Sequence, residues 1–94
     1  MNDLQLDYFM AVATNLSFTK TSEELFVSQP AISRQISQLE KELGCRLFRR
    51  NNQGTELTEE GRLYFDLFSK YKAEFINTKL KAEQIGRASC RERV

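Results

Sequence analysis

The chain has 94 residues, of which 40% are apolar and 29% are charged, which suits one small globular domain of the soluble type. It has no histidine, which removes the commonest general base and metal ligand, and its two cysteines are too few for a disulfide framework. No apolar run reaches the ~20 residues of a membrane span and no signal peptide is visible, so we expect a cytoplasmic protein without a membrane anchor. The net charge is only +1, so a claim of nucleic-acid binding must rest on where the charges lie.

The first helix is predicted to start at Asn2 or Asp3, either of which can cap it, and to run to about Asn15. We expect Asn15 to take the left-handed conformation that ends the helix. Its apolar residues recur at helical spacing and predict one buried face: Leu6, Phe9, Val12, Ala13 and Leu16.

A second, short helix is predicted to begin at Ser17 or Thr19, with Leu25 and Phe26 on its apolar side. Only a few residues separate it from the next helix. Two helices joined by so short a turn, the second with a polar face, are typical of a helix-turn-helix motif. Many small helical domains contain similar hairpins with a purely structural role, so this pattern alone leaves both interpretations open.

Residues 27–44, VSQPAISRQISQLEKELG, predict a third helix with a defined start, stripe and end. Ser28 can cap it, Pro30 falls in its first turn, and Gly44 suits a left-handed C-terminal cap. The apolar stripe consists of Ile32, Ile36, Leu39 and Leu43. The opposite side carries Pro30, Ser33, Arg34, Ser37 and Lys41, among which Arg34 points most directly outward.

Residues 46–57 predict a small β-hairpin, or wing. Its turn is Asn51-Asn52-Gln53-Gly54, and Thr55-Glu56-Leu57 can pair back on the strand that contains Leu47 and Phe48. Three arginines are expected to cluster at its base: Arg46, Arg49 and Arg50. A basic turn beside an exposed helix suits phosphate contact and minor-groove insertion, whereas the same arginines without such a helix would be ordinary solvated charges.

Thr58 can cap a long final helix over residues 59–84, with Glu59 and Glu60 in the first turn, where the helix dipole favours negative charge. A helix of roughly 25 residues extends ~37 Å, beyond a small domain. Its apolar stripe is wide and aromatic: Leu63, Tyr64, Leu67, Phe68, Tyr71, Phe75 and Ile76. We expect part of this stripe to be buried against a second chain, and the alternative is that it packs wholly against its own domain.

Several segments together resemble the N-terminal domain of LysR-type transcriptional regulators, in register and without gaps over about residues 1–80. They are Tyr8-Phe9-Met10-Ala11-Val12-Ala13, Ser17-Phe18-Thr19, Val27-Ser28-Gln29-Pro30-Ala31-Ile32-Ser33-Arg34-Gln35-Ile36, Leu39-Glu40, Leu43-Gly44, Leu47-Phe48 and Leu57-Thr58-Glu59-Glu60-Gly61. The run from Ser28 to Ile36 is close to a family signature.

This resemblance implies a mainly α-helical fold, in which residues 1–58 form a winged helix-turn-helix domain and residues 59–84 a linker or dimerisation helix. The helix-turn-helix motif would span about residues 18–37, and its second helix would be the recognition helix in the major groove. The residues that match DNA-contacting positions, or lie beside the wing arginine, are Ser17, Thr19, Gln29, Pro30, Ser33, Arg34, Arg49 and Arg50.

The chemistry of these residue types agrees with such a role. Gln29 can pair with adenine, Pro30 can touch a thymine methyl group, and Arg34 can bind guanine or clamp a phosphate. Ser17 and Thr19 match positions where helix ends meet phosphates, and Arg50 matches the family's wing arginine.

The final helix resembles the linker helix that pairs two subunits of these regulators. The expected partners are therefore double-stranded DNA and a second copy of the chain, which would set two recognition helices about one DNA turn or a small multiple apart. The residues predicted to form the dimer contact are Leu63, Tyr64, Leu67, Phe68, Tyr71 and Phe75. We expect no cofactor and no enzymatic activity, because histidine, metal-spaced cysteines and a glycine-rich phosphate loop are all missing from the sequence.

The chain departs from the family pattern in several respects, among them a wing that Asn51 and Asn52 make more neutral than usual. Thr21-Ser22 stands where many members have two alanines, and Gln53 stands where a wing-tip arginine is common. Full members also have a larger domain that binds a small co-inducer, which these residues do not include.

The alternative function is a winged helix used only for protein association through the last helix.

Residues 85–94, IGRASCRERV, break the helical pattern, and we interpret them as a non-native tail. The peptide looks like the translation of a common sequencing-library adapter, in which case Cys90 and the tail arginines carry no function. Without the tail's three arginines and one glutamate the net charge changes from +1 to −1. DNA binding would then depend on the local placement of charge.

Overall fold

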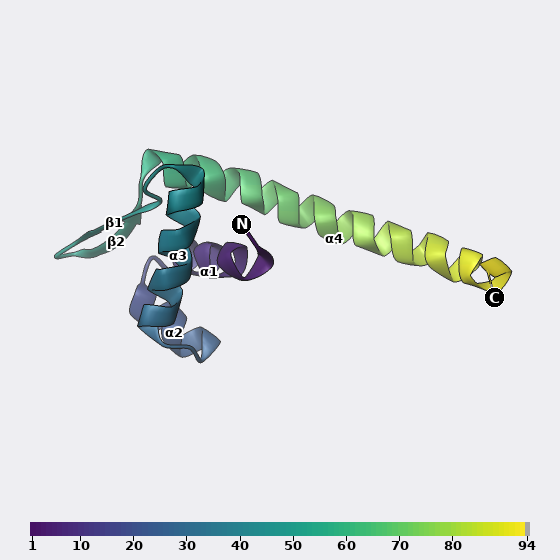
Figure 1. The fold of residues 1–94 in the computed structure, drawn as a ribbon, viewed down its shortest axis with the longest axis horizontal. Helices are drawn as coiled ribbons and strands as arrows, with labels where there is room; N and C mark the ends of the chain where they lie inside the picture. Colours follow the sequence, from purple (N-terminus) through teal and green to yellow (C-terminus); the bar gives the residue numbers. More distant parts are fainter. Residues whose placement is uncertain (94) are drawn as a thin grey trace.

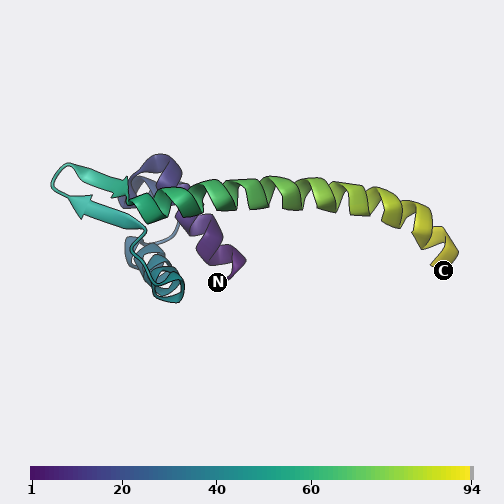
Figure 2. The ribbon, with the colours of Figure 1, turned by 90° about the horizontal axis from the view of Figure 1, so that it is seen from above.

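A computed structural model describes the backbone of residues 1–93 and the side chains of residues 1–85. Four helices and a two-stranded hairpin follow one another along the chain in the order α1, α2, α3, β1, β2, α4. The first three helices and the start of α4 form a small helical cluster, from which the hairpin projects on one side and α4 on the other (Figure 1). Figure 2 shows α4 leaving this cluster as one long, gently curved helix.

Helix α1 spans Asp3–Asn15, and its start and end are both set by local hydrogen bonds. The Asn2 side chain caps it by accepting from the Gln5 N–H at 2.8 Å. The left-handed residue at its end is Leu16, with φ of 50°, so the expectation that Asn15 would take this conformation is wrong. Asn15 instead donates its side-chain amide to the Thr21 hydroxyl at 3.1 Å.

Helix α2 spans Phe18–Leu25 and starts at Ser17, whose hydroxyl accepts from the Lys20 N–H at 3.0 Å. The residue that ends α2 is Phe26, which is left-handed with φ of 58° and 93% exposed. Phe26 therefore does not belong to the buried side of the helix, contrary to expectation, because the left-handed backbone turns its side chain away from the core. The turn to α3 is short, as predicted.

Helix α3 spans Gln29–Leu43 and has the predicted caps. Ser28 accepts from the Ala31 N–H at 3.3 Å, and Gly44 ends the helix with φ of 77°. Its stripe residues Ile32, Ile36 and Leu39 are buried. Burying this stripe against α1 and α2 leaves the polar side of α3 facing solvent.

The wing is a two-stranded antiparallel hairpin of β1, Phe48–Asn51, and β2, Gly54–Leu57. Its register pairs Phe48 with Leu57 and Asn51 with Gly54, so the predicted asparagine-rich turn closes the hairpin. Thr58 then connects the wing to α4. Its N–H donates to the Leu47 carbonyl at 3.0 Å, its hydroxyl donates to the Arg46 carbonyl at 2.5 Å, and the same hydroxyl accepts from the Gly61 N–H at 2.9 Å.

The core lies where the three first helices, the base of the wing and one turn of α4 meet. Its centre is aromatic: the Phe9 ring lies 5.4 Å from the Phe48 ring and 5.7 Å from the Phe68 ring, between centroids. Phe68 is only 4% exposed. It is therefore a core residue of its own domain, which corrects its placement among the residues available to a second chain. Tyr64 is partly buried against the same core.

Helix α4 spans Glu59–Arg93, which is longer than the predicted 59–84. The helix continues past Gln84, where the apolar pattern ends, because none of the following residues is a proline and only one is a glycine. The side chains of residues 86–94, which include Cys90 and the tail arginines, lie outside the described residues, and the adapter origin of residues 85–94 stays a prediction. Among the described residues, no helix combines the length and apolarity needed to cross a membrane.

Candidate nucleic-acid interface

The first two turns of α3 expose three of the residues predicted to contact DNA. Gln29, Pro30 and Arg34 are exposed, and Ser33 beside them is half-buried. The buried Ile32 and Ile36 hold this face outward, since they lie on the opposite side of the same turns. Arg34 forms no ion pair within the described residues, so its guanidinium keeps all five N–H donors for a ligand.

The start of α2 lies against the start of α3 through a side-chain contact. The Gln29 amide donates to the Thr19 hydroxyl at 3.0 Å. This contact brings together one residue predicted to bind a base and one predicted to bind a phosphate. Ser17 caps α2 and lies at its N-terminal end, where the helix dipole favours a phosphate oxygen.

The two wing arginines lie on opposite sides of β1, since successive strand residues alternate between faces. Arg49 forms an ion pair with Glu56, its cross-strand neighbour, at 3.3 Å. Arg50 turns back toward the helices: its Nη2 donates to Ser33 Oγ at 2.9 Å and its Cζ lies 3.7 Å from the centre of the Phe18 ring. The expected arginine cluster at the base of the wing is therefore split between two faces of the hairpin.

A hollow of about 310 Å³ lies between α3 and the wing. Its lining includes Ser33, Ser37, Arg46 and Arg50, which offer hydrogen-bond donors, and the carboxylate of Glu40. Arg46 Nε lies 3.8 Å from Glu40 Oε2, so part of this positive charge is already paired. Arg49 lies at a different hollow, with Arg62 and Glu59.

Glu40 and Phe18 are two residues of the site whose roles the sequence did not indicate. Glu40 Oε2 accepts from the Leu47 N–H at 2.7 Å and from the Phe48 N–H at 3.4 Å, which ties the start of the wing to α3. Phe18 is the platform under the Arg50 guanidinium. The only signal was that Leu39-Glu40 and Ser17-Phe18-Thr19 are among the segments shared with the family.

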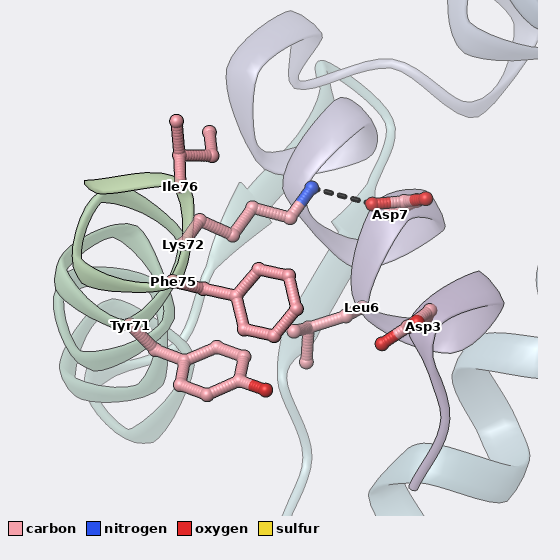
Figure 3. A pocket seen from close by; sticks show the side chains of 7 residues that line it. All are labelled: Asp3, Leu6, Asp7, Tyr71, Lys72, Phe75 and Ile76. Atoms are coloured by element: carbon pink, nitrogen blue, oxygen red, sulfur yellow. Dashed lines mark hydrogen bonds and ion pairs between the residues drawn. The ribbon is translucent and has the colours of Figure 1, made fainter. Parts of the chain in front are cut away.

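The far side of the domain presents apolar surface between α1 and α4. Figure 3 shows Tyr71 and Phe75 of α4 pointing toward Leu6 of α1 across a hollow of about 230 Å³, whose lining also includes Ile76. A charged contact between Lys72 and Asp7 bridges the two helices at its rim. Four of the six predicted dimer residues are about half exposed or more: Leu63, Leu67, Tyr71 and Phe75. Tyr64 is partly buried, so five of the six keep accessible surface.

Helices α2 and α3 are joined by a short turn, and α3 exposes its polar face. A β-hairpin lies beside them, and a long helix projects from the domain. This arrangement defines a winged helix-turn-helix DNA-binding domain. Residues 4–62 match the family described as "Bacterial regulatory helix-turn-helix protein, lysR family". The chain belongs to this family, and it is the DNA-binding domain of a LysR-type transcriptional regulator.

Curated relatives show the same likeness over part of their length. The chain is 57% identical over 60 residues to the glycine cleavage system transcriptional activator of Escherichia coli (strain K12), which is 64% of this chain and 20% of that protein. It is 36% identical over 80 residues to the transcriptional regulator CitR of Bacillus subtilis (strain 168), which is 85% of this chain and 28% of that protein. The chain thus spans between a fifth and three tenths of the length of these relatives.

Solved structures agree over nearly the whole chain. The crystal structure of the BenM DBD in complex with catB site 1 DNA is 34% identical, with a TM-score of 0.84, and the match covers 92% of this chain and 97% of that one. The crystal structure of the CbnR DBD in complex with DNA is 32% identical, with a TM-score of 0.77, and covers 96% and 99%. The predicted fold class is confirmed by these likenesses.

Proposed function

We propose that this domain binds operator DNA in a sequence-specific manner, with the N-terminal half of α3 in the major groove. The observation that carries this proposal is the exposed guanidinium of Arg34, which has no ion-pair partner among the described residues, beside Gln29 and Pro30 on a helix whose opposite face is buried. An arginine presented in this way can donate two hydrogen bonds to the O6 and N7 atoms of guanine. Two related domains of the same fold are solved as complexes with DNA, which supports the proposal.

The contacts to the DNA backbone are proposed to come from the rim of this face. Ser17 and Thr19 at the start of α2 would meet phosphates, where a helix N-terminus and hydroxyl groups bind oxygen anions. Arg49 on the outer face of the wing would meet the next stretch of backbone once it exchanges Glu56 for a phosphate. Because the net charge is only +1, affinity would depend on these few placed groups.

Selection of bound sequences from a random DNA pool tests this proposal. We expect a defined consensus and a log-linear fall of affinity with salt. Arg34→Ala should lose about 1–3 kcal/mol on the selected sequence and relax the preference at one base pair. Lys41→Ala is the matched control, since Lys41 is exposed on the same helix several turns from its N-terminal end, and it should leave the preference unchanged. No binding even at low salt would favour the alternative, a module for protein association only.

We also propose that the chain forms a homodimer through α4. Leu63 and Leu67 are 71% and 55% exposed, and they continue as an apolar stripe through Tyr71 and Phe75, which is more apolar surface than a monomer needs to expose. A dimer would place two α3 helices about one DNA turn or a small multiple apart. Such a geometry predicts an inverted repeat in the selected DNA.

The molar mass in solution, measured by sedimentation equilibrium, tests the dimer. Leu67→Glu should give a monomer with unchanged helical circular dichroism, because a charge cannot be buried in an apolar contact without a partner. Ala73→Glu is the control, since this exposed residue lies on the same helix on the side away from the stripe. A wild-type chain that stays monomeric at all concentrations would contradict the proposal.

The proposed ligand places the regulator in the cytoplasm, where bacterial DNA lies. Control by a small co-inducer is proposed to belong to a part of such regulators outside these 94 residues.

A further inference from the structure

Arg50 is held in place by two elements other than its own strand. Its guanidinium carbon lies 3.7 Å from the centre of the Phe18 ring of α2, and its Nη2 donates to Ser33 Oγ of α3 at 2.9 Å. The Phe18 ring is buried and packs edge-on against Phe48 at 5.7 Å between centroids, so the platform under the guanidinium is itself fixed. The side chain of Arg50 therefore bridges the wing, α2 and α3.

This bridge determines what the Ser33 hydroxyl can offer. A hydroxyl has one O–H donor and two acceptor lone pairs, and Arg50 occupies one lone pair. The adjacent positive charge disfavours a second donor at the remaining lone pair and polarises the O–H bond. Among the described residues no acceptor receives the Ser33 proton, and Ser33 lines the open hollow between α3 and the wing. Ser33 is thus presented as a hydrogen-bond donor.

A donor at this position would discriminate among bases. The major-groove edge offers acceptors at purine N7, guanine O6 and thymine O4, whereas cytosine offers its N4 amino group as a donor. A hydroxyl free to rotate can serve either kind of group. A hydroxyl held by Arg50 favours an acceptor and disfavours the cytosine amino group.

We propose that Arg50 is a positioning residue that holds Ser33 as a hydrogen-bond donor toward an acceptor atom on a DNA base, rather than a residue that contributes its charge to a phosphate. This rests on the proposed function, in which α3 lies in the major groove. Arginine is suited to the task because its planar guanidinium can stack on Phe18 with its face while it donates to Ser33 from its edge. A lysine at the same place keeps the charge but has no planar group to make both contacts.

The lysine substitution separates the two roles. We measure the affinity of the wild type, Arg50→Lys, Ser33→Ala and the double variant for the selected DNA and its single-base variants over a range of salt concentrations. Arg50→Lys should lose about three- to tenfold in affinity, the effect of one neutral hydrogen bond, and should relax preference at the same base pair as Ser33→Ala. The salt dependence should stay unchanged, and the double variant should be no weaker than Ser33→Ala alone.

If Arg50 instead contacted a phosphate, the opposite results for affinity, base preference and salt dependence would be expected. Arg50→Lys would then keep most of the affinity and all of the base preference, while Arg50→Ala would weaken binding to every sequence and lower the salt slope by about 1. That result overturns the proposal, as does additivity of the two single substitutions. Lys41→Arg is the control, since this exposed residue of α3 lies outside the proposed contacts, and it should leave affinity and base preference unchanged.

A measurement without DNA tests the bridge itself. In the free protein, NMR should show the Arg50 side-chain protons shifted by the ring current of Phe18, and Phe18→Leu should remove this shift in a chain that remains folded by circular dichroism. An unshifted Arg50 overturns the proposal whatever DNA binding shows. Failure of the proposed function is distinguishable, because the wild type would then bind no DNA sequence preferentially and Arg34→Ala would change nothing.

Discussion

Gly61 lies where the first turn of α4 touches the backbone of the wing, and we predict that Gly61→Ala destabilises the domain. A Cβ atom there would lie 2.1 Å from the Leu47 carbonyl oxygen and 3.0 Å from Leu57 Cδ2. The Leu47 oxygen cannot move away freely, because it accepts the Thr58 N–H at 3.0 Å. This glycine is required by lack of space, since its backbone is helical.

The expected change in the free energy of unfolding combines one stabilising effect with two destabilising ones. Alanine is favoured over glycine inside a helix by about 1 kcal/mol. Overpacking costs about 1–3 kcal/mol when atoms must shift, and distorting the bond from Thr58 to Leu47 costs about 1–2 kcal/mol more. The clash therefore outweighs the helix preference, and the free energy of unfolding should fall by about 2 kcal/mol. For a domain of this size this lowers Tm by about 8–16 °C.

Thermal and urea unfolding followed by circular dichroism, at one fixed protein concentration, measure this effect. Arg62→Ala is the control for helix preference, since Arg62 is the exposed neighbour in the same turn. Gly44→Ala is the control for backbone strain: its φ is +77° but nothing lies within 4 Å of the added carbon, so it should cost only the 1–2 kcal/mol or so of a left-handed residue. A Gly61→Ala chain as stable as the wild type would refute the close approach of α4 to the wing.

Three further predictions concern single residues. Phe26→Asn should raise the free energy of unfolding, measured in urea, by about 0.5–1 kcal/mol, because asparagine tolerates the left-handed backbone of this exposed residue. A fall in the free energy of unfolding would contradict this and show that the Phe26 side chain makes stabilising contacts. Glu40→Ala should cost about 1–3 kcal/mol and speed hydrogen exchange of the Leu47 amide, and unchanged exchange would contradict the bond between them. Burial, with the nearby carboxylates, raises the pKa of the Cys45 thiol, so the folded chain binds this proton more tightly than the unfolded chain. The free energy of unfolding should therefore fall as pH rises above the ordinary thiol range, and Cys45→Ala should lessen that fall.

Local signals predicted the helices and the wing well, because each signal acts over a few residues. Ser28 and Gly44 bound α3 as predicted, and the turn closes the hairpin as predicted. One error lies where two neighbouring residues compete for one local role. Leu16 takes the left-handed position in place of Asn15, since α1 continues through Asn15 and that asparagine side chain is engaged with α2.

Family likeness in the sequence indicated the candidate DNA-contacting residues, but it could not show how they are partnered. Gln29 and Thr19 are ten residues apart, and the contact between them depends on the packing of α2 against α3. Successive residues of a strand point to opposite faces, so the side chains of Arg49 and Arg50 are placed on different faces only once β1 is known to include both residues. The partner of Arg50 is seventeen residues away on α3 and follows from the orientation of the wing.

The sequence by itself determined the order of the elements, both caps of α3, the outward face of α3 and membership in the LysR family, since these depend on local residue types and spacing. Only the tertiary structure decided that Phe68 is core while Leu67 beside it stays exposed, because the angle at which α4 crosses α1 selects which part of one apolar stripe is buried. The same is true of Arg50. Its sequence position indicates a wing arginine, and the packing of three elements around its guanidinium directs it to Ser33.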